Sequence, residues 1–87
     1  MIRAHIIVKP KAEVMDPQGQ AVREALEHLG FENVGEVRVG RFLSVDLFTN
    51  DVPLAQATVE QMCQKLLANP IVEDYEIRLE TREEVAP

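Results

Sequence analysis

The N-terminal stretch alternates apolar and polar side chains with a period of two, and this alternation constrains the fold most strongly. Its apolar positions are Ile2, Ala4, Ile6 and Val8. A period of two is typical of a strand with one buried face. Ile7 lies on the polar side, so that side is also expected to be partly covered. The sequence therefore predicts a strand over residues 2–9.

A helix is predicted to follow this strand. Asp16 stands where an N-cap residue is favoured, and Pro17 suits the first helical position because it has no N–H to satisfy and its φ is already helical. Apolar residues then recur at helical spacing as far as Gly30, a residue that often ends helices. The first turn and Gly19 could instead bind an anion. Capping is favoured, since the Asp16 carboxylate would repel that anion.

Two runs of β-branched and aromatic residues flank Gly40 and Arg41. This pair suits a tight two-residue turn whose first position needs positive φ, which predicts a hairpin over residues 33–48. One long strand bent at Gly40 fits the same pattern. Arg38 and Arg41 could hold a carboxylate across an interface or keep a sheet edge soluble.

A second helix and a last strand complete the pattern. Asn50 or Asp51 is the expected N-cap, and the helix is expected to end near Ala68, before Asn69-Pro70. A strand with alternating Tyr75, Ile77 and Leu79 follows. Residues 81–87 are expected to form a flexible tail.

The element order is thus β-α-β-β-α-β, an α+β fold that is ferredoxin-like in order. It predicts two helices packed on one face of a small antiparallel sheet. Ile7, Phe42 and Phe48 would project from the other face, which is expected to form a subunit interface. At 87 residues a single domain over residues 1–80 has a small core, so a homo-oligomer is expected.

Composition limits the possible functions. A formal charge of −6 opposes binding to a phosphate backbone, because such binding depends on clustered Lys and Arg. Cys63 is the single cysteine, so an internal disulfide is excluded. No apolar run approaches the roughly 18 residues of a membrane span. The N-terminus does not resemble a signal peptide, so a cytoplasmic location is expected.

No pattern in the sequence indicates an active site. His5 and His28 are far apart and lack the i, i+4 partner of a helical metal site. Cys63 lies on an apolar helix stripe, where burial would raise the thiol pKa. The carboxylates near the C-terminus are expected to form a solvated face; they are Glu73, Asp74, Glu76 and Glu80. We therefore expect no catalytic, cofactor-binding or metal-binding residue on this chain.

Three stretches taken together resemble the signature blocks of a known family. They are VMDPQGQAV at residues 14–22, VRVGR at 37–41 and MCQKLLANPIVEDYEI at 62–77. Together they are similar to the PurS family, the small subunit of phosphoribosylformylglycinamidine synthase, over residues 1–80. The departures are mild, with Met15 where leucine is commoner and Arg41 where lysine is commoner.

The resemblance implies a non-catalytic role in purine biosynthesis. The synthase converts formylglycinamide ribonucleotide, glutamine and ATP into formylglycinamidine ribonucleotide, glutamate, ADP and phosphate. A glutaminase subunit releases ammonia, and a large synthetase subunit uses ATP and magnesium. The family's small subunit bridges the two, assists ammonia transfer, and forms dimers or tetramers through its strands and hairpin.

The matching motifs also imply which residues shape the subunit interfaces. These candidates are Asp16, Gln18, Gly19, Arg38, Gly40, Arg41, Asn69, Glu73, Asp74 and Tyr75. An ACT-like ligand-sensing domain shares the element order, but it would need a glycine-containing loop after the first strand, which residues 10–16 lack. A hydrolase of the acylphosphatase type would need an arginine within residues 9–15, and none is present.

Overall fold

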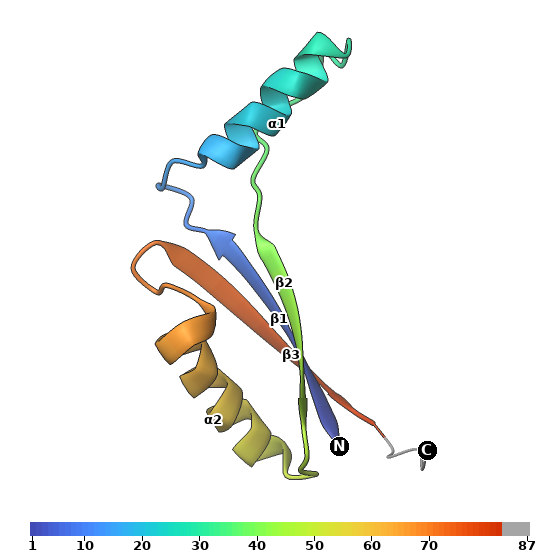
Figure 1. Ribbon diagram of the computed structural model, residues 1–87, viewed down its shortest axis with the longest axis vertical. Coiled ribbons are helices and arrows are strands. Elements are labelled where there is room, and N and C mark those ends of the chain that lie inside the picture. Colours follow the sequence, from blue (N-terminus) through green and yellow to red (C-terminus); the bar gives the residue numbers. More distant parts are fainter. Residues whose placement is uncertain (83–87) are drawn as a thin grey trace.

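Strand β1 (Ile2–Pro10) is the centre of a three-stranded antiparallel sheet with the order β2-β1-β3. The structure is a computed structural model that describes residues 1–82. In it, β1 pairs with β2 (Arg41–Leu47) on one side and with β3 (Glu73–Thr81) on the other (Figure 1). The predicted α+β class and the small antiparallel sheet are confirmed.

The core lies on one face of this sheet. Ile6 of β1 stands opposite Leu43 of β2 and Ile77 of β3, so the apolar positions of the three strands share one face. Helix α2 (Val52–Met62) and a π-helical turn, η1 (Cys63–Leu67), pack on that face. The buried hydrophobic residues are Ile2, Ala4, Ile6, Val8, Ala55, Val59, Cys63 and Ala68. The predicted buried face of the first strand is therefore confirmed.

Helix α2 begins as its sequence predicts. The Asp51 side chain accepts a hydrogen bond from the Leu54 N–H at 3.1 Å, and Pro53 lies in the first turn. Of the two candidate caps, Asp51 is thus the one used. The helical path continues through η1 to Leu67, close to the expected end.

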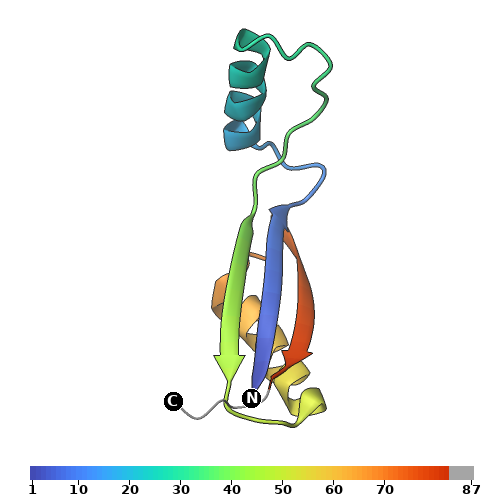
Figure 2. The ribbon, with the colours of Figure 1, turned by 90° about the vertical axis from the view of Figure 1, so that its right-hand side faces the viewer.

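Helix α1 (Pro17–His28) does not pack beside α2, so the prediction that both helices cover the sheet is corrected. Figures 1 and 2 show α1 projecting beyond the end of the sheet, while α2 alone lies on the apolar face. Residues 31–40 run back from the far end of α1 to β2. We call α1 and residues 31–40 together the arm. The expected left-handed stop is present, because Gly30 has a φ of 96°.

The hairpin expected around Gly40 is also corrected. Residues 33–40 form no strand within this chain and lead directly into β2, which begins at Arg41, so the alternative of one long strand bent at Gly40 is not present either. The turn would need positive φ at Gly40, yet Gly30 is the glycine that adopts it. Gly40 instead lies against β1, where an added Cβ would be 2.3 Å from the Val8 carbonyl oxygen.

The ordered domain extends past residue 80. Thr81 pairs with Ile2, and the Arg82 N–H donates to the Met1 carbonyl at 2.8 Å. The rest of the predicted tail, residues 83–87, lies outside the described residues. Within residues 1–82 there is no helix with the length and apolarity needed to cross a bilayer.

Candidate functional site

The predicted interface residues gather where the arm joins the sheet, at the end of β1 and the beginnings of β2 and β3 (Figure 1). They form two groups. One surrounds the start of α1 and contains Asp16, Gln18, Gly19, Arg38 and Gly40. The other joins η1 to β2 and β3 and contains Arg41, Asn69, Glu73, Asp74 and Tyr75.

In the first group, Asp16 makes two hydrogen bonds with backbone groups from different segments. Its Oδ1 accepts from the Gly19 N–H at 3.0 Å, which is the predicted cap, and its Oδ2 accepts from the Val39 N–H at 2.7 Å. Both bonds lower the pKa of the Asp16 carboxyl, and the bond from Val39 has the larger effect. The ionised carboxylate thus ties the start of α1 to the segment before β2.

Gly19 lets these two segments approach closely. It is the buried residue of α1, and a Cβ added there would lie 2.1 Å from the Val37 carbonyl oxygen. A side chain larger than hydrogen would force the helix away from residues 31–40. Gln18, by contrast, is exposed to solvent on the first turn of α1.

Arg38 fastens the arm to the end of β1. Its guanidinium donates to the Lys11 carbonyl oxygen and, at 3.2 Å, to the Glu36 carboxylate. Lys11 itself bonds to the other side of the sheet, because its N–H donates to the Val72 carbonyl at 3.0 Å and its Nζ to Asp74 at 2.9 Å. The contact with Asp74 raises the pKa of Lys11. Sequence reasoning did not select Lys11, because no local pattern marks its long-range partners.

In the second group, Arg41 and Glu73 hold the end of η1. The Arg41 guanidinium donates to the Glu73 carboxylate and to the Leu67 carbonyl, each at 3.0 Å. Glu73 also accepts from the Asn69 N–H at 2.7 Å. Arg41 therefore has a carboxylate partner within its own chain, and the loop around Asn69 is closed by side chains from both edge strands.

Tyr75 anchors the same region. Its hydroxyl accepts a hydrogen bond from Gln64 of η1 at 2.8 Å. Tyr75 is partly buried against the core, so it connects β3 and the core to η1. Gln64 was missed by the sequence reasoning, since only the fold brings it to this hydroxyl.

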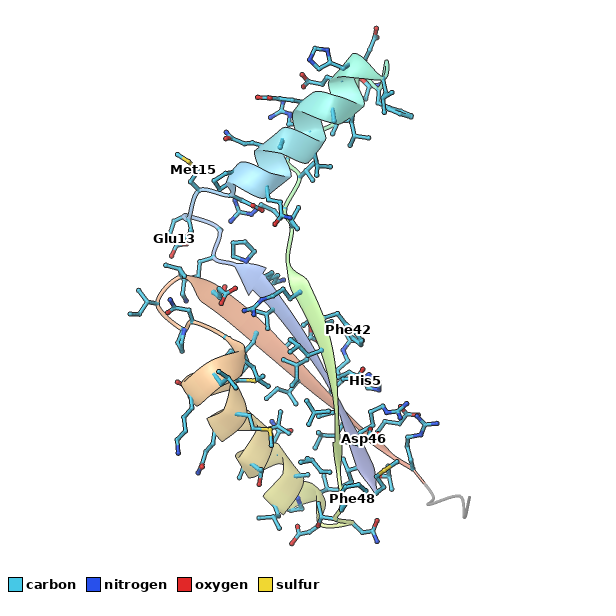
Figure 3. All side chains as sticks on the ribbon, in the orientation of Figure 1. His5, Glu13, Met15, Phe42, Asp46 and Phe48 are labelled. Carbon is cyan, nitrogen blue, oxygen red and sulfur yellow. The ribbon has the colours of Figure 1, made fainter. Side chains whose placement is uncertain are left out.

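The face of the sheet opposite α2 is more polar than predicted. Phe42 does project there, with 64% of its surface exposed, whereas Phe48 lies just past the end of β2 and is 89% exposed. Ion pairs lie beside them, with Arg3 to Asp46 at 2.7 Å and His5 to Glu80 at 2.9 Å. The His5 ring also stacks on Phe42 at a centroid distance of 5.8 Å. Figure 3 shows His5, Phe42 and Asp46 pointing away from α2.

These contacts favour the ionised carboxylates on the open face. The hydrogen bond from Arg3 lowers the pKa of Asp46, and the hydrogen bond with His5 lowers the pKa of Glu80. The same pairing raises the pKa of Arg3. The charges on this face are therefore largely paired within the chain.

The described residues hold little that could perform chemistry. Within residues 1–82, no three His, Cys, Asp or Glu side chains are grouped as metal ligands. Cys63 is buried in the core, and burial raises the pKa of its thiol, which disfavours the reactive thiolate. The side chains of the two groups hold loops in place and leave exposed surfaces around them.

Comparison with known proteins identifies the family. The family model for PurS, described as phosphoribosylformylglycinamidine (FGAM) synthase, matches residues 3–81. The PurS subunit of Methanocaldococcus jannaschii is 40% identical over 80 residues, covering 92% of this chain and 96% of that one. The PurS subunit of Bacillus subtilis is 40% identical over 86 residues, covering 99% of each chain.

Solved structures agree with this assignment. The crystal structure of Methanocaldococcus jannaschii PurS, a subunit of formylglycinamide ribonucleotide amidotransferase in purine biosynthesis, has a TM-score of 0.85 and covers 95% of this chain and 100% of that one. A chain of the PurLQS structure from Thermotoga maritima, 27% identical, has a TM-score of 0.80 and covers 92% of this chain and 99% of that one. The chain therefore belongs to the PurS family, a subunit of the purine-biosynthetic ligase phosphoribosylformylglycinamidine synthase.

Proposed function

We propose that the chain is the non-catalytic adaptor of the synthase, bridging the glutaminase and the large synthetase subunits and assisting ammonia transfer. The observation that carries this proposal is the junction of arm and sheet. There Asp16, Arg38 and Arg41 are all engaged in holding segments together. The related Thermotoga maritima chain comes from a structure of PurLQS, which supports partnership with the other subunits.

The chemistry of ammonia explains why an adaptor is useful. Ammonia loses its nucleophilicity when it is protonated, and it escapes when it reaches bulk water. Fixing the two active sites relative to one another shortens and shields its route, and this requires no catalytic group on the adaptor. ATP and magnesium would bind the synthetase subunit, and we propose a cytoplasmic location for the complex.

We also propose that the chain acts as a homodimer or homotetramer. Several large apolar side chains are exposed on it, including Leu29, Phe48 and Leu66 at 74%, 89% and 81%. Exposure of this extent on a small domain is typical of surfaces that a partner covers.

Reconstitution tests the adaptor role. Formylglycinamidine ribonucleotide formation is measured from the glutaminase and synthetase subunits with and without this chain, using either glutamine or ammonium chloride as the nitrogen source. The chain should be inactive alone and should raise the glutamine-dependent rate, while the ammonia-dependent rate of the synthetase changes little. Equal glutamine-dependent rates with and without the chain would contradict the proposal.

Calorimetry separates the adaptor from an ACT-like sensor. The isolated chain is titrated with amino acids and with nucleotides. An adaptor should give no heat of binding, whereas a sensor should bind one of these ligands. The loop at residues 10–16 favours the adaptor, because it has no glycine.

A further inference from the structure

Two loops lie side by side where the arm joins the sheet. Residues 11–16 connect β1 to α1, and residues 68–72 connect η1 to β3 (Figure 1). The Lys11 N–H donates to the Val72 carbonyl at 3.0 Å, which bonds one loop to the other. Each loop contains part of a stretch that resembles the PurS family. We call residues 11–16 and 68–72 together the loop pair.

The second of these loops is closed by its own hydrogen bonds. The Asn69 carbonyl accepts from the Val72 N–H at 3.1 Å and from the Glu73 N–H at 2.8 Å, and the Asn69 side chain accepts from the Ile71 N–H at 3.2 Å. The Asn69 N–H donates to the Glu73 carboxylate, and Pro70 has no N–H. Every backbone N–H from Asn69 to Glu73 is therefore bonded within the loop, which fixes its backbone.

The first loop is fixed as well. The Val14 N–H donates to the Lys11 carbonyl at 3.0 Å, so residues 11–14 form a turn. The Lys11 Nζ reaches across to Asp74 at 2.9 Å, and Asp16 is held by the Gly19 N–H at 3.0 Å. The two loops thus form one rigid unit at the end of the sheet.

This rigid unit carries apolar side chains that the chain itself does not cover. Ile71 is 83% exposed, Met15 74% and Val72 37%. Figure 3 shows Met15 and Glu13 pointing outward, away from the sheet. Turn residues are usually small or polar, so large apolar ones on two bonded loops indicate a contact surface. A fixed backbone lowers the entropy that such a contact loses on binding.

The charges around these side chains are mainly negative. Over residues 11–16 and 68–74, four acidic side chains accompany the single basic residue Lys11, and they are Glu13, Asp16, Glu73 and Asp74. Backbone N–H groups, Arg41 and Lys11 bind the last three of these carboxylates. Glu13 is exposed and forms no ion pair among residues 1–82. Its carboxylate can therefore pair with a cation from another molecule.

We infer that the loop pair is a docking surface for a partner subunit of the synthase, an inference that rests on the proposed adaptor role. The partner presents an apolar pocket that receives Ile71, and a lysine or arginine at the rim of this pocket faces Glu13. An apolar centre with a charged rim is the usual anatomy of a protein interface. Ile71 is the anchor, because it is the most exposed apolar side chain of the loop pair.

Titration of the reconstituted synthase tests the anchor. The chain is titrated into fixed amounts of the glutaminase and synthetase subunits, and the concentration that gives half of the maximal glutamine-dependent rate is measured. Ile71→Asp should raise this concentration at least about tenfold, because a carboxylate is costly to bury in an apolar pocket. Leu54→Asp is the matched control. Leu54 is 54% exposed at the start of α2, at the opposite end of the sheet, so its variant should behave as wild type.

Salt dependence tests the charge. Glu13→Gln should raise the half-maximal concentration about two- to fivefold at low salt, the range of an exposed ion pair. The variant should also respond less than wild type to added sodium chloride, because salt screens the attraction that the variant lacks. Glu24→Gln, the same change at an exposed position on α1, should keep the affinity and the salt response of wild type.

Cross-linking identifies what the loop pair contacts. Ile71→Cys is labelled with a benzophenone maleimide, and Cys63 stays unlabelled because it is buried in the core. Irradiation of the assembled complex should join the labelled chain to the glutaminase or to the synthetase subunit. Cross-links that join only copies of this chain would assign the loop pair to self-association and overturn the inference.

Two further results would overturn the docking surface. One is an unchanged half-maximal concentration for Ile71→Asp, and the other is an equal increase for Leu54→Asp. Circular dichroism and the native mass of the chain alone check that Ile71→Asp keeps its fold and its oligomeric state. If wild type raises the glutamine-dependent rate and Ile71→Asp does so at the same concentration, the docking surface is wrong and the adaptor role stands. If wild type itself raises no rate, the adaptor role is wrong.

Discussion

The Val39 N–H donates a 2.7 Å hydrogen bond to the Asp16 carboxylate, joining two residues 23 positions apart. The same carboxylate caps α1 through Gly19. One side chain therefore starts the helix and fixes the segment that returns to the sheet. The direction of the arm depends on this double contact.

Asp16→Asn should destabilise the protein more than Asp51→Asn. Asparagine keeps one acceptor oxygen, but its amide NH₂ would face either the Gly19 or the Val39 N–H. Asp51 has only a cap contact to lose, its bond from Leu54 at 3.1 Å. Thermal melting at one fixed protein concentration measures both variants. Equal decreases in melting temperature would show that the Val39 contact adds nothing.

Stability should fall as the pH drops into the acid range. The folded-state pKa of Asp16 lies below its ordinary value, as do those of Asp46 and Glu80. The stabilisation from such groups is present above the unfolded pKa and is lost as the pH falls through the folded pKa. Urea midpoints should therefore decrease from about pH 6 to about pH 3. Asp16→Asn should show a smaller decrease, and an identical decrease would contradict the role of Asp16.

Gly19→Ala should destabilise the protein although alanine favours helices. An added Cβ would lie 2.1 Å from the Val37 carbonyl oxygen, so the helix must move, at a cost typically of about 1–3 kcal/mol. Gly35→Ala is the matched control, because nothing lies within 4 Å of an added Cβ there. That change should stay within about 1 kcal/mol of wild type. Chemical denaturation measures both, and equal stability of the two variants would contradict the close approach.

Local sequence patterns predicted the features that depend on residues close together in the chain. The buried face of β1 follows from period-two alternation, and the caps at Asp16 and Asp51 follow from residue preference at helix starts. The position of α1 could not be predicted in this way. An apolar stripe shows that a helix face is covered but not which molecule covers it.

The long-range contacts of the site carried no local signal either. Arg41 and Glu73 are 32 residues apart, and their pairing depends on β2 and β3 flanking β1. The predicted turn at Gly40 failed for a related reason. Glycine suits positive φ but also suits close packing, and at Gly40 it is the packing against Val8 that requires glycine.

Arg41→Lys should loosen the loop between η1 and β3. A single guanidinium nitrogen, Nη2, reaches both Glu73 and the Leu67 carbonyl, and the shorter side chain of lysine does not place its ammonium group at the same point. Arg41 is about half exposed, so the loss of global stability should be at most about 1 kcal/mol. Hydrogen exchange should become faster at the Asn69 amide, whose N–H donates a hydrogen bond to the Glu73 carboxylate.

Arg78→Lys is the control for that experiment. Arg78 pairs with Glu76 on the open face of the sheet, far from the loop, so the Asn69 amide should keep its wild-type exchange rate. Unchanged exchange at Asn69 in Arg41→Lys would show that Glu73 holds the loop without its arginine.

Gln18→Ala should leave the fold intact and weaken assembly of the synthase. Gln18 is exposed on the first turn of α1, next to the junction that Asp16 fixes, so the backbone position from which its side chain can reach a partner is fixed. Circular dichroism and melting should match wild type. Mass measurement of the three mixed subunits, with ADP and glutamine, should show affinity reduced about tenfold. Gln20→Ala, the same change two residues along and hence on another side of the helix, should assemble normally. If Gln18→Ala assembles as wild type does, this stretch serves as a helix cap and presents no contact to the complex.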